Sequence, residues 1–215
     1  MKTAIRNQKG FTLLEIIVVL AVLGALSAML TPVVFRYIDD ANRTRAQGDT
    51  QTLAAAIQQM YKDTGRWPFY AVGTGKNSYV SGTDAALLSS NSACDLADTD
   101  LATCDNAEPV TDSGTTWVFT GKADSLARQL ITNASSYPTS GGRAWKGPYV
   151  DAIPALDPWG RSYLVNIANA DPDAATNKWV VVISAGPDGN LETAADTLGT
   201  ANPTVGGDDV IARVK

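Results

Sequence analysis

The chain has 215 residues, carries a formal net charge of −5 and contains no histidine. The missing imidazole excludes catalytic triads built on histidine and every zinc site that needs a histidine ligand. The acidic balance argues against a nucleic-acid partner, because phosphates are bound by basic surfaces. The sequence also shows no nucleophile paired with a base and no phosphate-binding loop, so we do not expect an enzyme.

The N-terminus changes character abruptly. The first ten residues, MKTAIRNQKG, are basic and polar, and the chain is almost entirely apolar from Phe11 to Val34. As a helix, this apolar segment would be about 36 Å long, enough to cross the hydrocarbon core of a membrane. The positive charge before it predicts a cytoplasmic N-terminus and an exported remainder.

One carboxylate, Glu15, interrupts the apolar segment. A charge inside a membrane is costly unless it finds a partner, and a simple signal anchor has no need of one. Cleavage between Gly10 and Phe11 would create a positive α-amine and make Glu15 the fifth residue of the mature chain. We therefore expect Glu15 to pair with the terminal amine of a neighbouring subunit when subunits assemble.

Residues 9–15, KGFTLLE, resemble the class III signal of type IV pilins and pseudopilins. The resemblance implies cleavage after Gly10 by prepilin peptidase and N-methylation of Phe11. Pro32 lies where many members of this family have a helix-kinking proline. The family also implies an inner-membrane precursor that enters a periplasmic or extracellular filament of identical subunits, with minor pseudopilins and an inner-membrane assembly platform as partners.

The helical pattern continues to about Lys62, with Pro32 as a point where the helix can bend. Its apolar stripe is expected to pack on a sheet and comprises Leu53, Ala56, Ile57, Met60 and Tyr61. Gly65 and Pro68 are typical of a helix end. We therefore divide the chain into a leader (1–10), a transmembrane or filament-core helix (11–34), the amphipathic half of the same helix (35–62) and a globular domain (63–215).

The globular domain is predicted to contain a surface insertion at 71–112, with one short helix at Asp84–Leu88. A second short helix is predicted at Ser125–Ile131, with Asp124 as its N-cap. The β-rich segments predict strands at Ser162–Ile167, Trp179–Ser184 and Val210–Val214. Together these elements predict an α+β pilin fold, in which a long N-terminal helix packs on a small antiparallel β-sheet with long loops.

Two cysteines, Cys94 and Cys104, lie in the insertion. They are too few for a four-cysteine zinc site, and in an exported protein the simplest interpretation is a disulfide that closes a surface loop. Such a short loop would contribute about 2–3 kcal/mol of stability.

Two further stretches resemble the major pseudopilin of type II secretion systems. Residues 145–163, WKGPYVDAIPALDPWGRSY, resemble its "GPY … DPWG.PY" region. Residues 184–189, SAGPDG, together with 206–211, GGDDVI, are similar to the calcium loop that closes that domain. Each stretch is also a good turn by itself, and an acidic solvated tail is the alternative interpretation of the second.

The resemblance implies a calcium site with side-chain ligands from Asp188, Asp208 and Asp209, completed by carbonyls near Ala185 and Asn190. Calcium is bound by oxygen atoms, so these groups suit it. The segment between Asp188 and Asp208 is longer than the family loop, and it contains two alternative ligands, Glu192 and Asp196.

The resemblance thus implies a major pseudopilin that helps to drive folded proteins across the outer membrane. The alternatives are the major pilin of a type IV pilus for adhesion or motility, or a minor pilin with an adhesive or ligand-binding insertion.

Overall fold

The structure is a computed structural model. It describes residues 10–68, 87–91, 110–112, 117, 123–134, 136–170, 178–195 and 204–215. The chain divides into two compact units, Met1–Ala41 and Asn42–Lys215. Residues 1–9 of the leader, Cys94, Cys104, Asp196 and most of the insertion lie outside the described residues, so the predicted disulfide stays a prediction.

The longest element is α1, Leu13–Thr64, a helix of 52 residues that runs through Pro32. It ends two residues beyond Lys62, so the expected long helix is confirmed. An 18-residue window of α1 has a mean hydropathy of 2.6, and none of that window is buried within the chain. This part of α1 is long and apolar enough to cross a membrane.

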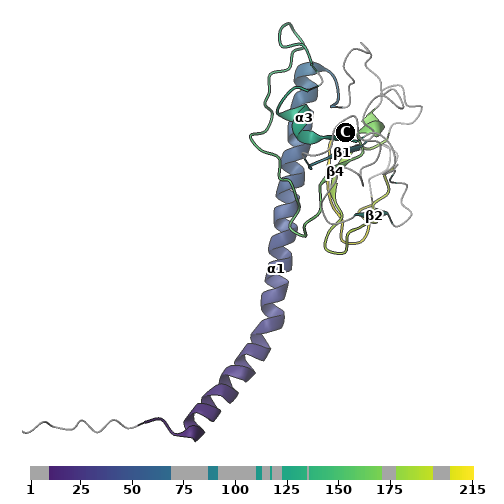
Figure 1. Ribbon diagram of the computed structural model, residues 1–215. Coiled ribbons are helices and arrows are strands. Elements are labelled where there is room, and N and C mark those ends of the chain that lie inside the picture. The colour runs from purple at the N-terminus through teal and green to yellow at the C-terminus, as the bar shows by residue number, and fades with distance from the viewer. Residues whose placement is uncertain are drawn as a thin grey trace, which may run out of the picture. The chain divides into compact units, whose positions relative to one another are not determined.

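The C-terminal unit contains a five-stranded sheet in the order β3-β1-β4-β5-β7. Figure 1 labels two of its strands, β1 and β4. Its strands are β1 (Leu87–Ser89), β3 (Ala123–Ser125), β4 (Leu164–Val165), β5 (Val181–Ser184) and β7 (Val210–Arg213). The three predicted strands correspond to β4, β5 and β7, each shorter than expected, and a 3-10 helix, η1 (Ile167–Ala170), follows β4.

The expectation of a wholly antiparallel sheet is wrong at one edge. The β4–β1, β4–β5 and β5–β7 pairs are antiparallel, but β1 and β3 are parallel. Parallel neighbours need a long connection, and the chain between Ser89 and Ala123 provides one. A separate two-stranded parallel ladder joins β2 (Thr111–Asp112) to β6 (Asn190–Leu191).

The C-terminal part of α1 packs on one face of the sheet. Its buried apolar stripe contains Leu53, Ala56, Ile57 and Met60, as expected. Burial of one large side chain of this kind contributes about 1.5–3 kcal/mol. Tyr61 departs from the expectation, because it is 40% exposed and stacks on Trp67 with ring centroids 4.1 Å apart.

The opposite face of the sheet is also covered. Val181 and Ile183 of β5 pack in a second cluster with Trp117 and Leu191, while Val182 faces the α1 side. Burial of both faces explains why β5 is an uninterrupted apolar run rather than an alternating one. The second cluster supports the loop that carries the predicted calcium ligands.

Two local predictions need correction. The segment predicted as a helix at Asp84–Leu88 contributes to β1, where the fully buried Leu88 pairs with Val165. Sheet pairing and burial override the local helix propensity there. The second predicted helix is confirmed as α3 (Leu126–Leu130), but its N-cap is Ser125, whose side chain accepts from the Ala127 N–H at 3.2 Å.

Candidate functional sites at the N-terminal segment and the acidic loop

The first site lies at the start of α1, where Thr12 and Glu15 are bonded to each other. Glu15 Oε2 accepts hydrogen bonds from the backbone N–H and the hydroxyl of Thr12, each at 2.8 Å. The Thr12 hydroxyl accepts one from the backbone N–H of Glu15 at 3.2 Å. This arrangement is a capping box, which satisfies backbone donors that the first turn of a helix leaves without partners. The box fixes the start of α1 next to Phe11.

The capping box leaves part of the Glu15 carboxylate available. Both bonds from Thr12 reach Oε2, and within the described residues Oε1 has no bonded partner. A carboxylate has about four acceptor positions, so Oε1 can accept a bond from outside the chain. The neighbouring apolar side chains, including Phe11, Leu13 and Leu14, are exposed. An external cationic partner for Glu15 is therefore compatible with its role in the cap.

The second site is an acidic loop formed by residues 186–192 and 206–209. Gly186 and Gly189 adopt φ angles of 65° and 79°, which glycine tolerates without strain. The two segments lie so close that a Cβ on Gly186 would be 2.7 Å from the Asp208 carbonyl oxygen. Glycine at this position therefore brings the turn around Asp188 against Asp208.

The turn at 157–161 holds the start of the acidic loop in place. Asp157 Oδ1 accepts the backbone N–H groups of Trp159 and Arg161, each at 2.9 Å, which holds the turn closed. Asp157 Oδ2 accepts the Ser184 hydroxyl at 2.6 Å, and Ser184 is the last residue of β5. The "DPWG" stretch thus fixes the point from which the acidic loop leaves the sheet.

Arg161 extends from this turn to the loop itself. Its Nη1 donates to the carbonyl oxygens of Gly186 at 3.1 Å and Pro187 at 3.4 Å. The guanidinium lies against Gly189, where a Cβ would collide with it. Arg161 therefore places a positive charge against the acidic loop, whose own ionisable groups are all acids.

Three carboxylates meet in the acidic loop. One oxygen each of Asp188, Glu192 and Asp208 lie within 4.8 Å of one another. Like unit charges about 5 Å apart repel by roughly 1 kcal/mol in bulk water, and by more where water is partly excluded. Asp208 Oδ1 is buried and has no hydrogen-bond partner among the described residues. This oxygen-rich set fits a hard divalent cation such as calcium.

Asp209, which the sequence predicted as a calcium ligand, uses one carboxylate oxygen within the loop, while its Oδ1 is buried and has no hydrogen-bond partner among the described residues. Its Oδ2 accepts the backbone N–H groups of Glu192 at 2.9 Å and Thr193 at 2.6 Å, which ties together the two segments of the loop. Burial raises the pKa of Asp209, and the charge of Asp208 acts in the same direction. The three carboxylates that lie together are the expected ligands Asp188 and Asp208 and the alternative ligand Glu192.

Asn190 and Ala185 flank the turn that carries Asp188. The Asn190 N–H donates to Asp188 Oδ1 at 2.8 Å, and this bond lowers the pKa of Asp188. The Asn190 side-chain oxygen accepts from the Thr111 hydroxyl, which links the loop to β2. Ala185 is buried beneath the loop. Both residues lie where carbonyl ligands were expected, so that part of the prediction stays open to test.

Comparison with known proteins adds independent evidence for the N-terminal site. Residues 5–31 match the family model of the prokaryotic N-terminal methylation motif. The chain is 49% identical over 57 residues to type II secretion system core protein G of Pseudomonas aeruginosa, covering 26% of this chain and 39% of that protein. It is 35% identical over 76 residues to the toxin coregulated pilin of Vibrio cholerae, covering 35% of this chain and 34% of the pilin. The N-terminal part of the chain is thus similar to that of type IV pilins and pseudopilins.

The chain spans less than half the length of these curated relatives, and the same holds for the fimbrial protein EcpC of Eikenella corrodens. That protein is 32% identical over 75 residues, covering 35% of this chain and 49% of its own length. No solved structure matches the chain significantly. The long apolar helix whose C-terminal part packs on a sheet is consistent with the pilin fold.

Two supporting features of these sites were not predicted from the sequence. The capping box was visible as Thr-x-x-Glu before an apolar run, a recognised helix-start signature. The support of the acidic loop by Arg161 and Ser184 has no comparable signature, because residues far apart in the sequence make it.

Proposed function

We propose that this chain is a structural subunit of a helical filament, namely the major pseudopilin of a type II secretion system that helps to drive folded proteins across the outer membrane. The observation that carries this proposal is the Thr12–Glu15 capping box, which lies within the methylation motif and opens an exposed apolar helix. Similarity to type II secretion system core protein G supports the secretion branch. The role is non-enzymatic.

In this proposal residues 1–10 are a leader that prepilin peptidase removes between Gly10 and Phe11, and Phe11 is then N-methylated. Before assembly, residues 11–34 hold the chain in the inner membrane with the N-terminus in the cytoplasm. The exposed apolar side chains of α1 support this anchor, because an apolar surface of this extent is unfavourable in water.

On assembly, the same apolar helix moves from the bilayer into the filament core, which lies in the periplasm or outside the cell. Residues 35–62 continue the helix and residues 63–215 coat the filament. Identical subunits joined head to tail by a non-closing operation form a helical polymer. Minor pseudopilins and the inner-membrane assembly platform are the other partners. Glu15 Oε1, which the capping box does not use, accepts a hydrogen bond from the methylated amine of Phe11 in a neighbouring subunit.

We also propose that the acidic loop binds calcium. Asp188, Glu192 and Asp208 would hold the ion, with carbonyls near Ala185 and Asn190 as further ligands. The three gathered carboxylates and the buried, unpartnered Asp208 Oδ1 support this assignment. Calcium would supply the positive charge that offsets carboxylate repulsion, and the loop would then be held closed against the second cluster.

A second candidate function is favoured by similarity to the toxin coregulated pilin and to a fimbrial protein. In that case the same subunit would build a surface type IV pilus. Deleting the gene distinguishes the two functions: the pseudopilin proposal predicts loss of protein secretion with surface pili intact. Loss of surface pili with normal secretion would assign the chain to the pilus.

The filament proposal is tested by Glu15→Gln. Glutamine can replace glutamate in a capping box, so this variant keeps the helix start and removes only the charge. A charge-assisted bond contributes about 1.5–3 kcal/mol, so we expect membrane insertion to be unchanged and filament yield to fall roughly tenfold or more. Asp39→Asn is the matched control, because Asp39 is an exposed acid on the same helix. Normal filament yield from Glu15→Gln would refute the assembly role of the charge.

A further inference from the structure

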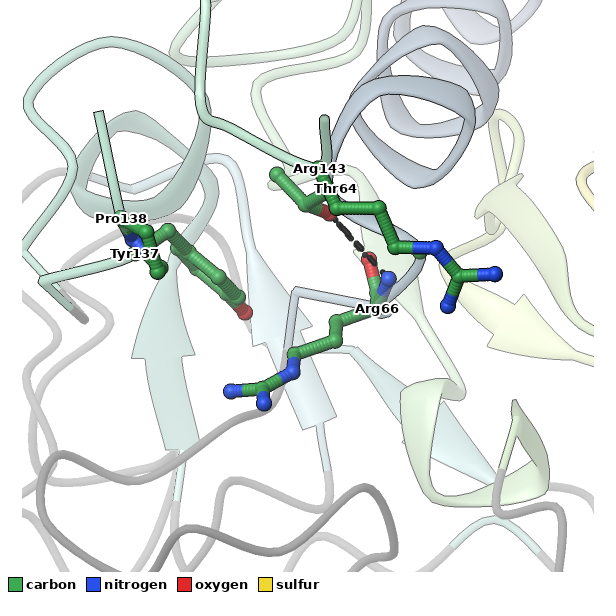
Figure 2. A pocket seen from close by; sticks show the side chains of 6 residues that line it. Thr64, Arg66, Tyr137, Pro138 and Arg143 are labelled. Atoms are coloured by element: carbon green, nitrogen blue, oxygen red, sulfur yellow. Dashed lines mark hydrogen bonds between the residues drawn. The ribbon is translucent and has the colours of Figure 1, made fainter. Parts of the chain in front are cut away.

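A pocket of about 170 Å³ lies at the C-terminal end of α1, away from the acidic loop residues described above. Figure 2 shows it from close by, with the side chains that line it. Its lining residues come from the end of α1 and from a later loop, and they are Thr64, Gly65, Arg66, Tyr137, Pro138 and Arg143.

The charge of this pocket is opposite to that of the chain. Two of its lining residues are arginines and none is acidic, although the chain has 22 acidic and 17 basic side chains. Nearby, the Lys146 ammonium is paired with Asp63 at 3.3 Å. Among the described residues, no carboxylate pairs with the Arg143 guanidinium. The positive charge of Arg143 is therefore available to a molecule that enters the pocket.

The walls of the pocket are held by bonds that do not use the Arg143 side chain. The Tyr137 hydroxyl donates to the Trp67 carbonyl at 2.9 Å, and the Tyr137 N–H donates to Asn133 Oδ1 at 2.9 Å. The backbone N–H of Trp145 donates to the Pro138 carbonyl at 2.6 Å, which closes the loop that carries Arg143. A preformed pocket of this kind loses less conformational entropy when a ligand binds.

The end of α1 also does not need Arg143 as a cap. The Thr64 hydroxyl donates to the Met60 carbonyl at 2.8 Å, and the Gly65 N–H donates to the Tyr61 carbonyl at 2.7 Å. These bonds already satisfy carbonyls of the last helical turn. Gly65, with a φ of 69°, leaves room for the guanidinium, since a Cβ there would be 2.8 Å from Arg143 Nη1.

We propose that this pocket binds a small oxyanion, that is, a carboxylate, sulfate or phosphate. A guanidinium offers a planar fork of N–H donors that matches the oxygens of these groups. The volume is below the roughly 300 Å³ at which pockets for drug-sized ligands begin, and it equals that of about six water molecules. The ligand is therefore a small acid rather than a large organic molecule.

The partial negative charge at the C-terminal end of α1 disfavours an anion, so the charge of Arg143 must outweigh it. Figure 2 shows the Arg66 and Arg143 side chains diverging, with their guanidinium groups directed away from each other. Arg143 alone therefore supplies the fork that binds the oxyanion. The pocket should thus lose most of its affinity when the Arg143 charge is removed, in contrast to a surface that attracts anions without a fixed geometry.

The experiment uses the full-length chain in an uncharged detergent, titrated with inorganic phosphate and, in parallel, with sulfate and acetate. Binding is followed by the NMR signals of the arginine side chains, with glycerol as a neutral control. Arg143→Gln is expected to weaken phosphate binding roughly tenfold or more, because a charge-assisted bond of about 1.5–3 kcal/mol is lost. Arg143→Lys, which keeps the charge without the fork, should be intermediate.

The matched control is Arg45→Gln, which removes the same charge from an exposed position on α1 and should leave phosphate affinity unchanged. Circular dichroism checks that each variant folds. The proposal would be overturned by the absence of saturable binding in the parent chain. Equal weakening by the Arg143 and Arg45 variants would also overturn it, because general attraction by net charge would then explain the binding.

Discussion

The Arg161 guanidinium donates from Nη1 to the carbonyl oxygen of Gly186 at 3.1 Å. This bond joins the turn at 157–161 to the acidic loop, and the charge of Arg161 helps to keep the pKa of Asp188 low, after the larger effect of the Asn190 N–H. Arg161 therefore contributes, without metal, part of the positive charge that the proposed calcium ion would add.

Arg161→Met should lower the free energy of unfolding of the calcium-free chain by about 1.5–3 kcal/mol, the usual contribution of a hydrogen bond from a charged donor. The loss of unfolding free energy should be smaller with saturating calcium, because the bound metal then holds the loop. In the variant, the ion is also no longer repelled by the positive charge of Arg161. Chemical denaturation with and without calcium measures both values, with Arg161→Lys as the charge-retaining control. An equal loss in both conditions would show that Arg161 does not act on the metal loop.

The ligand set of the acidic loop can be tested with amide substitutions. Asp208→Asn and Glu192→Gln should each weaken calcium binding roughly tenfold or more, because ligand charge sets the affinity of calcium sites. Asp209→Asn should change it little, since the Asn oxygen can still accept the two N–H groups that Asp209 binds. Calorimetric titration gives the three affinities. A larger effect from Asp209→Asn than from Glu192→Gln would favour the ligand set expected from the family loop.

Tyr163 joins the sheet to α1 through its hydroxyl, which donates to Asp49 Oδ2 at 2.8 Å. Tyr163→Phe should lower the free energy of unfolding by about 1.5–3 kcal/mol, because the bond is to a charged acceptor. Tyr137→Phe is the control: its hydroxyl bonds to the neutral Trp67 carbonyl, so about 0.5–1.5 kcal/mol should be lost. Chemical denaturation measures both, and a larger effect at Tyr137 would contradict this ranking.

Asp124 provides a test of pH dependence. Burial raises its pKa, despite bonds to Gln129, Ser125 and Arg128 that act in the opposite direction. The folded chain thus keeps this proton to a higher pH than the unfolded chain, and stability is lost as the pH rises from about 4 through the folded pKa. Asp124→Asn does not titrate, so the stability of the parent relative to this variant should fall by about 1.4 kcal/mol per unit of pKa difference. Denaturation curves from pH 4 upward would contradict this if the difference were flat or rose.

How far the fold follows from the sequence depends on the range of the interactions. The helix α1 and its apolar stripe were predictable, because spacing along one helix determines them. The strand at Leu88 was not, since its pairing with Val165 joins distant segments and overrides a local helix preference. The sequence predicted Asp124 as the N-cap of α3, but the cap is Ser125. Both side chains are good caps, and only the local backbone conformation determines which of them acts as one.

The same distinction holds for the sites. Glu15 and the Gly10–Phe11 junction form a contiguous motif, so the sequence predicted them together. The acidic loop required the fold, because its two segments are brought together by glycine turns and by Asp209. Glu192 joins Asp188 and Asp208 only because that loop closes, which local sequence does not reveal.

Processing of the filament subunit can be measured as the intact mass of the chain isolated from assembled filaments. We expect this mass to lack residues 1–10 and to include one additional methyl group on Phe11. A filament subunit that retains Met1, or that begins at any residue other than Phe11, would contradict this expectation.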